Sequence, residues 1–510
     1  MPRTTRRTFL KNTALGSATL ALASTLQAQT APAVRTALAK PPRQPNVLLL
    51  WTDQHRADTM PYANNPVIKT PTFSKLAAQS FVFPGARCTE PVCTPSRGSI
   101  MTGLWPHAHG SVQNNIPLRS DAKCLAEMLP AGYATAYMGK WHLGSEITAQ
   151  HGFNEWVSIE DGIYRDYYAN PEDRKRRSSY HSYLLKNGFP PDEVEKDTKA
   201  ALYSRTMAAA MAEPFTKAHF LANEAERFLR ERRDGAPFFL SVNTLEPHPP
   251  TYGPLNGFYD PATMPTGPAF AQPPADDAAG LVRRTYQRIH EEGYKNHPTQ
   301  TRDDWKRIRA NYYGLITMVD NAFARILRAL EASGEADNTI IVYTSDHGEM
   351  AGDHCLMQKS VFYDQATNIP LMIHVPWISR SQVRLDGPIS QIDLVPTILD
   401  LMGANVPAHL QGRSRAGVLR DSKTWKQDDI VVEWHGEDFK EEDGRSLVTT
   451  DGWKLNLYRG NTPELYDLNT DPGELHNLVR VAKHSDRVRR LTNQLRAWQV
   501  AQQDSIPLAG

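Results

Sequence analysis

The sequence predicts an α/β protein in which a large, mostly parallel β-sheet is flanked by helices and a smaller α+β domain follows. Short apolar runs alternate with amphipathic helical patterns through the first 400 residues. Beyond that point the runs are joined by Asp-Gly and Asp-Pro-Gly turns, which are typical of a small antiparallel sheet. At 510 residues the chain is too long for one simple core. We therefore expect a catalytic α/β domain over 44–400 and a small C-terminal domain over 401–510.

Five apolar runs predict the strands of the large sheet, and their continuous hydrophobicity predicts buried, parallel strands. In chain order they are NVLLLWTD (46–53), YATAYMGKWH (133–142), PFFLSVNTLEPHPP (237–250), NTIIVYTSDHG (338–348) and NIPLMIHVP (368–376). Helical spacing of apolar residues predicts helices over 219–232 and 312–333. We interpret the polar ranges 155–235 and 250–310 as insertions and long loops that carry substrate specificity.

The C-terminal region contains three further strand-like segments and a last helix. The strand segments are DIVVEWHG (429–436), GRSLVTTDGWKLNLYR (444–459) and PELYDLNTDPGE (463–474). The helix is predicted over 485–499, with its apolar residues on one face. Together they predict an antiparallel sheet that is covered by a terminal helix.

The N-terminus is typical of an export signal. Arg6 and Arg7 in TRRTFLKN are followed by the mildly apolar TALGSATLALAST and then by small residues. This order is that of a secretory signal, and the apolar part is too short to span a bilayer. The Arg-Arg-x-Phe-Leu-Lys pattern resembles bacterial twin-arginine signals, which deliver folded proteins to the twin-arginine export machinery. We expect a signal peptide over 1–33 and a periplasmic or secreted protein without stable membrane insertion; a disordered basic tail is the alternative.

Charge and cysteine content exclude several classes of function. Lys and Arg number 57 against 56 Asp and Glu, so nothing indicates a nucleic acid partner. The four cysteines, Cys88, Cys93, Cys124 and Cys355, form no Cys-x-x-Cys motif. Four cysteines in so long a chain are not a disulfide framework, and their spacing does not indicate structural zinc.

Polar residues follow the predicted strands of the large sheet. These residues are Asp53, Lys140, His142, His248, Asp346 and His347. Each by itself has an ordinary explanation, such as a helix cap or a solvated charge. In an open α/β sheet, however, ligands bind beyond the carboxyl ends of the strands. Six such residues at one edge therefore predict a functional site.

The chemistry of these residues indicates a cation and an anionic substrate. The candidate metal ligands are Asp53, Gln54, Asp346 and His347. Their mainly oxygen donors suit one divalent cation, Ca²⁺ or Mg²⁺, with Mn²⁺ possible because of the imidazole. Arg97, Lys140 and Lys359 add positive charge. A cation and several basic side chains imply a sulfate or phosphate group in the substrate.

Cys93 is the candidate nucleophile. Pro95 favours the first turn of a helix, which puts Cys93 at a helix N-terminus that stabilises an anion. A buried structural cysteine and an ordinary thiolate nucleophile are the alternatives. A thiolate is poorly matched to a hard metal and, after export, is open to oxidation.

The segment CTPSRGSIMTG (93–103) follows the sulfatase signature Cys-x-Pro-Ser-Arg. Further blocks resemble that family in the family's own order: PNVLLLWTDQHRAD, TGLWPHAHG, GYATAYMGKWHLG, PFFLSVNTLEPHPP, DNTIIVYTSDHGEMAGDH and ELYDLNTDPGELHNL. Nearly all of the mature chain thus resembles the formylglycine-dependent (type I) sulfatases of the alkaline-phosphatase superfamily. The resemblance implies the alkaline-phosphatase-like version of the predicted α/β fold.

The resemblance also implies a mechanism. A separate formylglycine-generating enzyme would convert Cys93 to formylglycine (3-oxoalanine); one hydroxyl of its hydrate attacks sulfur, and the other expels sulfate from the sulfated enzyme. The implied metal ligands are Asp53, Gln54, Asp346, His347 and the modified Cys93. Arg97 would steady the hydrate, and Lys140 and Lys359 would bind sulfate. His142 would assist proton loss from the hydrate, and His248 would protonate the leaving oxygen.

Two residues depart from the commonest pattern of the family. Many members have Asp in place of Gln54 and Asn in place of His347, and both departures occur in a branch with choline-sulfatase-like enzymes and phosphonate monoester hydrolases. The phosphonate branch lacks the Lys-x-His pair that is intact here as Lys140 and His142, so the match favours sulfate.

We therefore predict a hydrolase of small sulfated carbohydrates or aryl sulfates. The alternatives are a phosphonate monoester or phosphodiester hydrolase and a non-catalytic binder of sulfated glycans. A binder is expected to have lost Cys93, Arg97 or a metal ligand. A choline-type substrate would need a cage for its cation, which the sequence does not reveal. Trp434, His435 and Arg445 are interpreted either as pocket residues or as core.

Overall fold

The structure is a computed structural model that describes residues 41, 43–161, 175–194, 201–232, 235–295, 297–436 and 442–509. The predicted signal peptide, residues 1–33, lies outside these residues. Among the described helices, none has both the length and the hydrophobicity that crossing a membrane requires.

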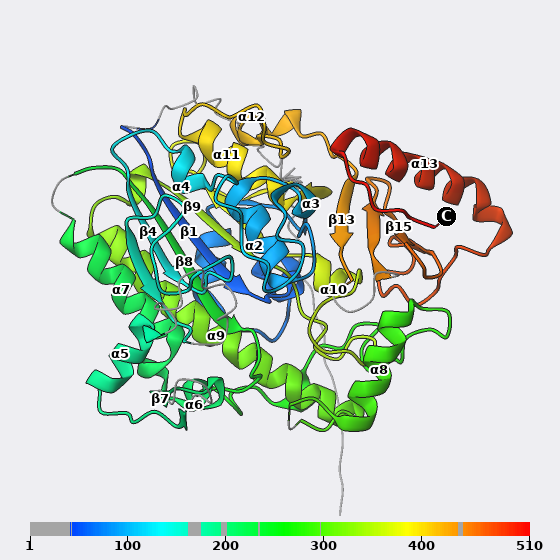
Figure 1. Cartoon of the computed structure of the whole chain (residues 1–510), viewed down its shortest axis with the longest axis horizontal. Helices are drawn as coiled ribbons and strands as arrows, with labels where there is room; N and C mark the ends of the chain where they lie inside the picture. The colour runs from blue at the N-terminus through cyan, green and yellow to red at the C-terminus, as the bar shows by residue number, and fades with distance from the viewer. Residues whose placement is uncertain are drawn as a thin grey trace, which may run out of the picture. The chain divides into compact units, whose positions relative to one another are not determined.

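An eight-stranded sheet forms the centre of the protein, with strand order β11-β2-β10-β9-β1-β8-β4-β5 (Figure 1). Its middle is parallel. β1 (Asn46–Asp53) lies between β8 (Phe238–Pro247) and β9 (Thr339–Ser345), and β4 (Ala134–Gly139) and β5 (Glu155–Ser158) extend the sheet beyond β8. The predicted fold class, a large mostly parallel sheet, is confirmed.

One predicted parallel strand runs the other way. β10 (Leu371–His374) pairs antiparallel with β9, so the prediction of a parallel strand was wrong here. A parallel return needs a crossover long enough to pass back along the sheet. Residues 346–370, all of them described, contain only the four-residue helix α10 (Asp364–Thr367) and no longer helix that could lie across a face of the sheet and return the chain to the starting end. The short strands β2 (Phe81–Val82) and β11 (Val383–Arg384) complete this edge.

Alternate residues of β1 pack into two different cores, one on each face of the sheet. Leu48 and Leu50 belong to a core shared with α7 (Lys217–Glu231) and α9 (Arg302–Ala332). Leu49 and Trp51 belong to a core shared with α2 (Cys93–Thr102) and α11 (Leu394–Leu401). Burial on both faces explains why the strand is apolar throughout rather than alternating.

The long helix α9 begins at Arg302 rather than at the predicted Tyr312. Thr301 and Asp304 form a capping box at its start, in which each side chain binds the backbone N–H of the other residue. The interpretation of 155–235 and 250–310 as insertions and loops was also partly wrong. Besides the predicted helix α7, these ranges contain the edge strand β5 and helix α8 (Gly280–Glu292). Helix α8 is largely exposed, with only Val282 and Ile289 buried, which explains its polar composition.

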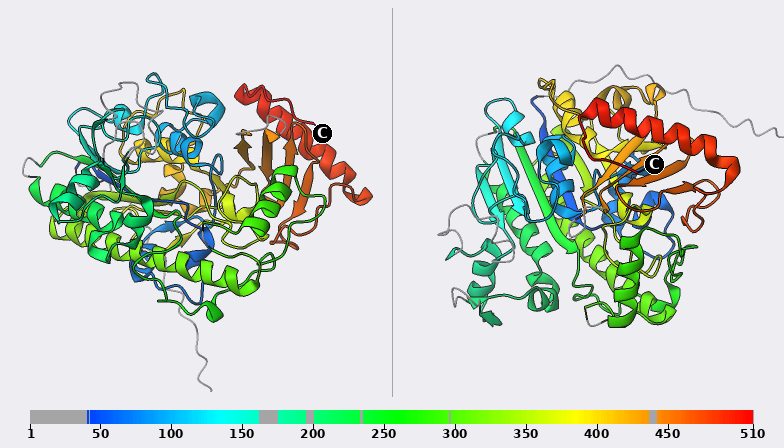
Figure 2. Two further views of the ribbon diagram at one scale, coloured as in Figure 1. Left: turned by 60° about the horizontal axis from the view of Figure 1, so that its bottom comes forward. Right: turned by 45° about the vertical axis from the view of Figure 1, so that its right-hand side comes forward.

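The C-terminal part is an antiparallel sheet with a helix, as predicted. Its strands are β13 (Ile430–Trp434), β14 (Gly444–Val448), β15 (Trp453–Tyr458) and β16 (Glu464–Asp467). Leu455 and Leu465 pack against Leu491 and Leu495 of α13 (Ser485–Gln502). The right-hand view of Figure 2 shows this red helix lying along the orange strands. The boundary at residues 400 and 401 stays a prediction.

Glu433 links the C-terminal sheet to α3 (Pro106–His109), and we expect its loss to destabilise the protein. Its Oε1 lies 2.6 Å from Nδ1 of His107, and its Oε2 lies 3.6 Å from Nη2 of Arg445. Burial raises the pKa of Glu433, but Arg445 and His107 more than offset this and lower it to about 2. Glu433→Gln should therefore lower the free energy of unfolding at pH 7 by about 3 kcal/mol, measured by urea denaturation.

The pH dependence of that loss follows from the sign of the shift. A carboxyl whose pKa falls on folding stabilises the protein above its ordinary pKa, and this stabilisation fades as the pH drops towards 2. The difference between wild type and Glu433→Gln should therefore shrink below about pH 4.5. The exposed Glu231 is a matched control, and Glu231→Gln should change stability by less than about 0.5 kcal/mol. Equal effects of the two substitutions would contradict the role of Glu433.

Trp434, His435 and Arg445 are all buried in this region of the C-terminal sheet.

Candidate active site

Two neighbouring strands bring the four candidate metal ligands together. β1 ends at Asp53, and Gln54 turns the chain away with a positive φ of 71°. β9 pairs with β1 so that Ser345 lies opposite Thr52, and Asp346 and His347 come next. The backbone N–H of Gln54 donates to Oδ1 of Asp346 at 2.9 Å. The predicted convergence at the carboxyl edge of the sheet is therefore observed.

The donor set fits a hard divalent cation. Donor atoms of Asp53, Cys93, Asp346 and His347 all lie within 4.8 Å of one another, and all four residues are buried. Nδ1 of His347 donates to the carbonyl oxygen of Gly348 at 2.9 Å, so Nε2 faces the site. Such an outer partner commonly orients a metal-binding histidine. Two carboxylates and an imidazole, with an amide oxygen of Gln54 beside them, match Ca²⁺, Mg²⁺ or Mn²⁺ better than zinc.

Cys93 is the first residue of α2, as predicted, and its thiol faces the same donors. Its Sγ lies 3.3 Å from Nε2 of His347, 3.0 Å from Nζ of Lys359 and 3.8 Å from Oδ1 of Asp53. Burial and Asp53 raise the pKa of Cys93, but Lys140, Lys359 and His347 outweigh them and lower it to about 7. An anion at this position is therefore stabilised.

The other three cysteines, all within the described residues, differ from Cys93 in this respect. Burial raises the pKa of the Cys88 and Cys124 thiols, and it raises the pKa of Cys355 to about 11. None of the four forms a disulfide.

Arg97 contacts the carboxylates of both Asp53 and Asp346, and Lys140 contacts that of Asp53. Arg97 is fully buried; its Nη2 lies 2.9 Å from Oδ2 of Asp53 and its Nε lies 2.9 Å from Oδ2 of Asp346. Lys140 also donates to Asp53. Burial raises the pKa of Asp53, but Lys140, His248, Arg97 and Lys359 more than offset this and hold it well below its usual value. The contact of Arg97 with the hydrated aldehyde stays a prediction.

The two candidate acid–base histidines, His142 and His248, also follow strands of the large sheet. His142 follows β4, and its backbone oxygen accepts a hydrogen bond from Thr94 of α2. His248 follows β8, and its Nδ1 donates to the carbonyl oxygen of Pro249 at 2.7 Å, which leaves Nε2 to act on a substrate. Burial is the largest cause that lowers the pKa of each histidine, followed by Lys140 for His142 and Lys359 for His248. A bound anion would counteract the two lysines.

Sequence reasoning missed three residues that support the site. Asn243 accepts from Nη1 of Arg97 at 2.8 Å, Tyr312 donates to the backbone oxygen of Gln54 at 2.7 Å, and Glu349 binds the Gln54 amide. A signal existed for Asn243, which is a polar residue inside the buried run FFLSVNTLEP. Tyr312 comes from α9, far along the chain, and its helical pattern gives no sign of this contact.

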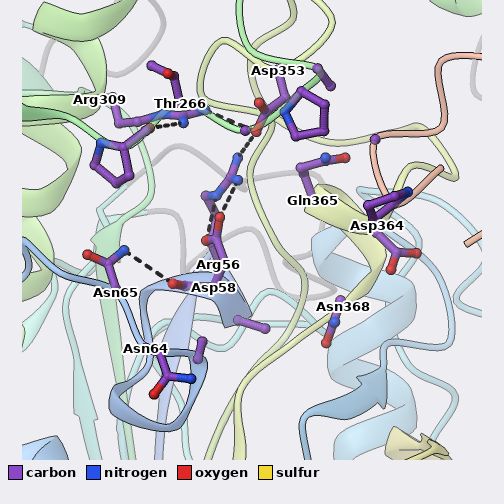
Figure 3. Close-up of a pocket in the computed structure, with 18 of the residues that line it drawn as sticks. Arg56, Asp58, Asn64, Asn65, Thr266, Arg309, Asp353, Asp364, Gln365 and Asn368 are labelled. Carbon is purple, nitrogen blue, oxygen red and sulfur yellow. Dashed lines mark hydrogen bonds and ion pairs between the residues drawn. The ribbon is translucent and has the colours of Figure 1, made fainter. Parts of the chain in front are cut away.

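A cavity of about 460 Å³ is lined in part by the loop that follows β1 (Figure 3). Arg56 lines this cavity and pairs with Asp58 and Asp353, and Arg309 also pairs with Asp353 (Figure 3). The predicted site residues do not line this cavity. Nη1 of Arg56 also donates to the backbone oxygens of Glu349 and Met350, so these charges tie the loop after β1 to the loop after β9.

Known proteins resemble the chain over most of its length. A family model described as Sulfatase matches residues 45–404, and one described as N-sulphoglucosamine sulphohydrolase, C-terminal, matches 352–501. The multifunctional alkaline phosphatase superfamily protein PehA of Trinickia caryophylli is 28% identical, covering 90% of this chain and 96% of its own. An arylsulfatase of Clostridium perfringens is also 28% identical, covering 87% and 92%. The crystal structure of a phosphonate monoester hydrolase of Agrobacterium radiobacter superimposes with a TM-score of 0.74 at 25% identity, covering 90% and 96%.

Proposed function

The chain belongs to the sulfatase family, and from that membership we propose that it hydrolyses the sulfate ester of a small carbohydrate or aryl alcohol. The proposed nucleophile is formylglycine derived from Cys93, acting beside one divalent cation, with Ca²⁺ as our first choice. One observation carries the proposal: Cys93 begins α2 with its thiol within 4 Å of His347, Asp53 and Lys359. A cysteine kept only for packing would not need such surroundings.

The residues present suit both groups that the proposal requires. Asp53, Asp346, His347 and the amide oxygen of Gln54 would hold the cation, which would polarise the sulfate oxygens and favour ionisation of a nearby hydroxyl. The hydrated aldehyde would supply two hydroxyls on one carbon, one for attack on sulfur and one for release of sulfate. Replacing a sulfur atom by oxygen atoms among Lys359, His347 and Asp53 leaves these side chains as hydrogen-bond partners.

The protein's own side chains then divide the remaining work. Lys359, 3.0 Å from Cys93 Sγ, is placed to attract the anionic group of the substrate. Lys140 and Arg97 keep Asp53 ionised, which is the form that binds a cation. His142 would take the proton of a hydroxyl, and His248 would give a proton to the leaving oxygen through Nε2.

A phosphonate monoester or phosphodiester hydrolase is the second candidate, favoured by Gln54, by His347 and by the resemblance to the Agrobacterium radiobacter enzyme. Lys140 and His142 favour sulfate. The deciding experiment compares kcat/KM for 4-nitrophenyl sulfate, 4-nitrophenyl phenylphosphonate and bis-4-nitrophenyl phosphate, and then screens sulfated mono- and disaccharides. We expect the sulfate to be turned over fastest, and a preference for phosphonate would overturn the assignment. A binder without activity would turn over none of the three.

The proposal includes maturation and export. A formylglycine-generating enzyme would act on Cys93, and the twin-arginine machinery would then export the folded protein to the periplasm or beyond. The order suits the chemistry, because oxidation of Cys93 and metal binding can both finish before export. The support is the sequence pattern of residues 1–33 alone.

His248→Ala should affect substrates according to the basicity of their leaving group. For an alkyl or sugar sulfate, kcat should fall by about 10²- to 10⁴-fold, because the alkoxide must then leave without a proton. For 4-nitrophenyl sulfate the loss should be far smaller, since nitrophenolate leaves unprotonated. Steady-state kinetics on both substrates measures the contrast. An equal loss on both would mean that His248 is not the general acid.

A further inference from the structure

The two ends of the Gln54 side chain are chemically opposite, and only one suits a cation. The amide oxygen accepts hydrogen bonds and can ligate a metal, whereas the NH₂ group only donates. The two ends have nearly the same shape, so shape alone does not choose between them. The choice depends on the hydrogen-bonding partners at each end.

The partners of Gln54 select one orientation. Nε2 donates to Oε2 of Glu349, and Oε1 accepts from Nζ of Lys359 at 2.7 Å. A carboxylate only accepts and an ammonium only donates, so the reversed amide would oppose like groups at both ends. The same Lys359 Nζ lies 3.0 Å from Cys93 Sγ, so the amide oxygen is on the side of the nucleophile.

Hydrogen bonds hold Glu349 in place, so its side chain cannot easily turn away from Gln54. Its other oxygen, Oε1, accepts the backbone N–H groups of Ala351, at 2.9 Å, and of Gln358. Its backbone oxygen accepts from Nη1 of Arg56 at 2.9 Å, and Arg56 is fixed by Asp58 and Asp353 in the cavity of Figure 3. Glu349 is 1% exposed, so water does not replace these partners.

We propose that Glu349 is a positioning residue that orients the Gln54 amide with its oxygen toward the bound cation. The inference rests on the cation site proposed above and extends it to a residue outside the donor set. It also explains how glutamine serves where many members of the family have aspartate. The negative charge then lies on Glu349, one side chain further from the cation, and acts on the cation by polarising the Gln54 amide.

Glu349→Gln is the sharpest test, because it keeps size and shape. The new amide must keep its oxygen toward the two backbone N–H groups, so its NH₂ faces the NH₂ of Gln54. Gln54 must then reverse and turn its own NH₂ toward Lys359 and the cation. We expect Ca²⁺ affinity to fall by about 10- to 100-fold, measured by calorimetric titration of the chelator-stripped, full-length protein with calcium chloride.

Exchanging the two residues provides the matched rescue. In the double variant Gln54→Glu/Glu349→Gln, one oxygen of the carboxylate introduced at position 54 accepts from the amide introduced at position 349. The other oxygen of that carboxylate faces Lys359 and the cation. The exchanged protein should recover Ca²⁺ affinity to within about threefold of wild type or exceed it, because the direct ligand now carries charge. Gln54→Glu alone opposes two carboxylates, so its cation-free Tm should be lower than that of the exchanged protein.

The outcomes separate this inference from the proposed function. Glu349→Gln that binds Ca²⁺ as tightly as wild type, or an exchange that binds no better than Glu349→Gln alone, would overturn the role of Glu349 while leaving the cation site intact. A wild-type protein that takes up neither Ca²⁺, Mg²⁺ nor Mn²⁺ would overturn both. Because the readout is binding, a failure to hydrolyse sulfate esters counts only against the proposed activity.

Discussion

Replacing Cys93 by alanine is expected to abolish turnover, with kcat falling by at least about 10⁴-fold, the scale seen when a covalent nucleophile is removed. The fold should survive. Cys93 is the first residue of α2, where alanine is accepted, and its removal leaves a gap smaller than one side chain. Steady-state hydrolysis of 4-nitrophenyl sulfate and a thermal melt of the same preparation measure the two effects.

The chemical state of Cys93 can be tested separately from activity. Protein co-expressed with a maturation enzyme should yield a peptide containing residue 93 that is about 18 Da lighter than the thiol form, with partial recovery of that mass by hydration. An unmodified thiol in fully active protein would contradict formylglycine and favour the thiolate, which the lowered pKa of Cys93, about 7, would permit.

Cys124→Ala is the control for loss of a buried thiol. Cys124 is as buried as Cys93, but its pKa is raised by burial and it lies outside the donor set of Cys93. We expect Cys124→Ala to lower Tm modestly and to leave kcat unchanged. A comparable loss of kcat in Cys124→Ala would show that the Cys93 result reflects packing.

Asp346→Asn should have the second largest effect, a loss of at least about 10³-fold in kcat/KM. Asp346 is a candidate cation ligand and at the same time the partner of Nε of Arg97 at 2.9 Å. Its Oδ1 also accepts the N–H groups of Gln54 and His347 at 2.9 Å each, so it shapes both loops. Losing its charge should weaken cation binding. It also leaves the buried guanidinium of Arg97 with one carboxylate partner, Asp53, instead of two.

Chelation and metal return distinguish this loss from simple destabilisation. Wild type stripped with EDTA should lose activity and regain it with millimolar Ca²⁺, whereas Asp346→Asn should stay inactive at the same concentration. Asp320, a buried aspartate of α9 that accepts the N–H groups of Thr72 and Phe73, is the matched control. Asp320→Asn should lower Tm yet keep its activity. If Ca²⁺ restores Asp346→Asn fully, Asp346 is not a ligand.

The sequence alone was sufficient for the fold class and for predicting which residues converge at the carboxyl edge of the sheet. Asp53, Lys140, His248 and Asp346 were predicted to meet because each follows a strand and because parallel strands share one carboxyl edge. That rule needs no knowledge of distances. The start of α2 at Cys93 was equally local, since Pro95 and the pattern after it specify a first helical turn.

Only the tertiary structure decided features that depend on contacts between distant segments. β10 pairs antiparallel with β9 because the segment between them contains no helix that crosses a face of the sheet. The apolar residues of β10 itself do not encode this direction. Arg445, a possible pocket residue from the sequence, is fully buried and bound to Asp504. The type of an amino acid does not by itself say whether its side chain lies in the core or lines a pocket.

The orientation of Gln54 is the clearest case of this division. The sequence placed Gln54 beside Asp53 but could not say which end of its amide faces Lys359 and the proposed cation. Glu349 and Lys359 decide that, and they lie about 300 residues further along the chain. The physical reason is that a residue's position along a strand is a local property, whereas the direction of a side-chain dipole is set by the charges packed around it.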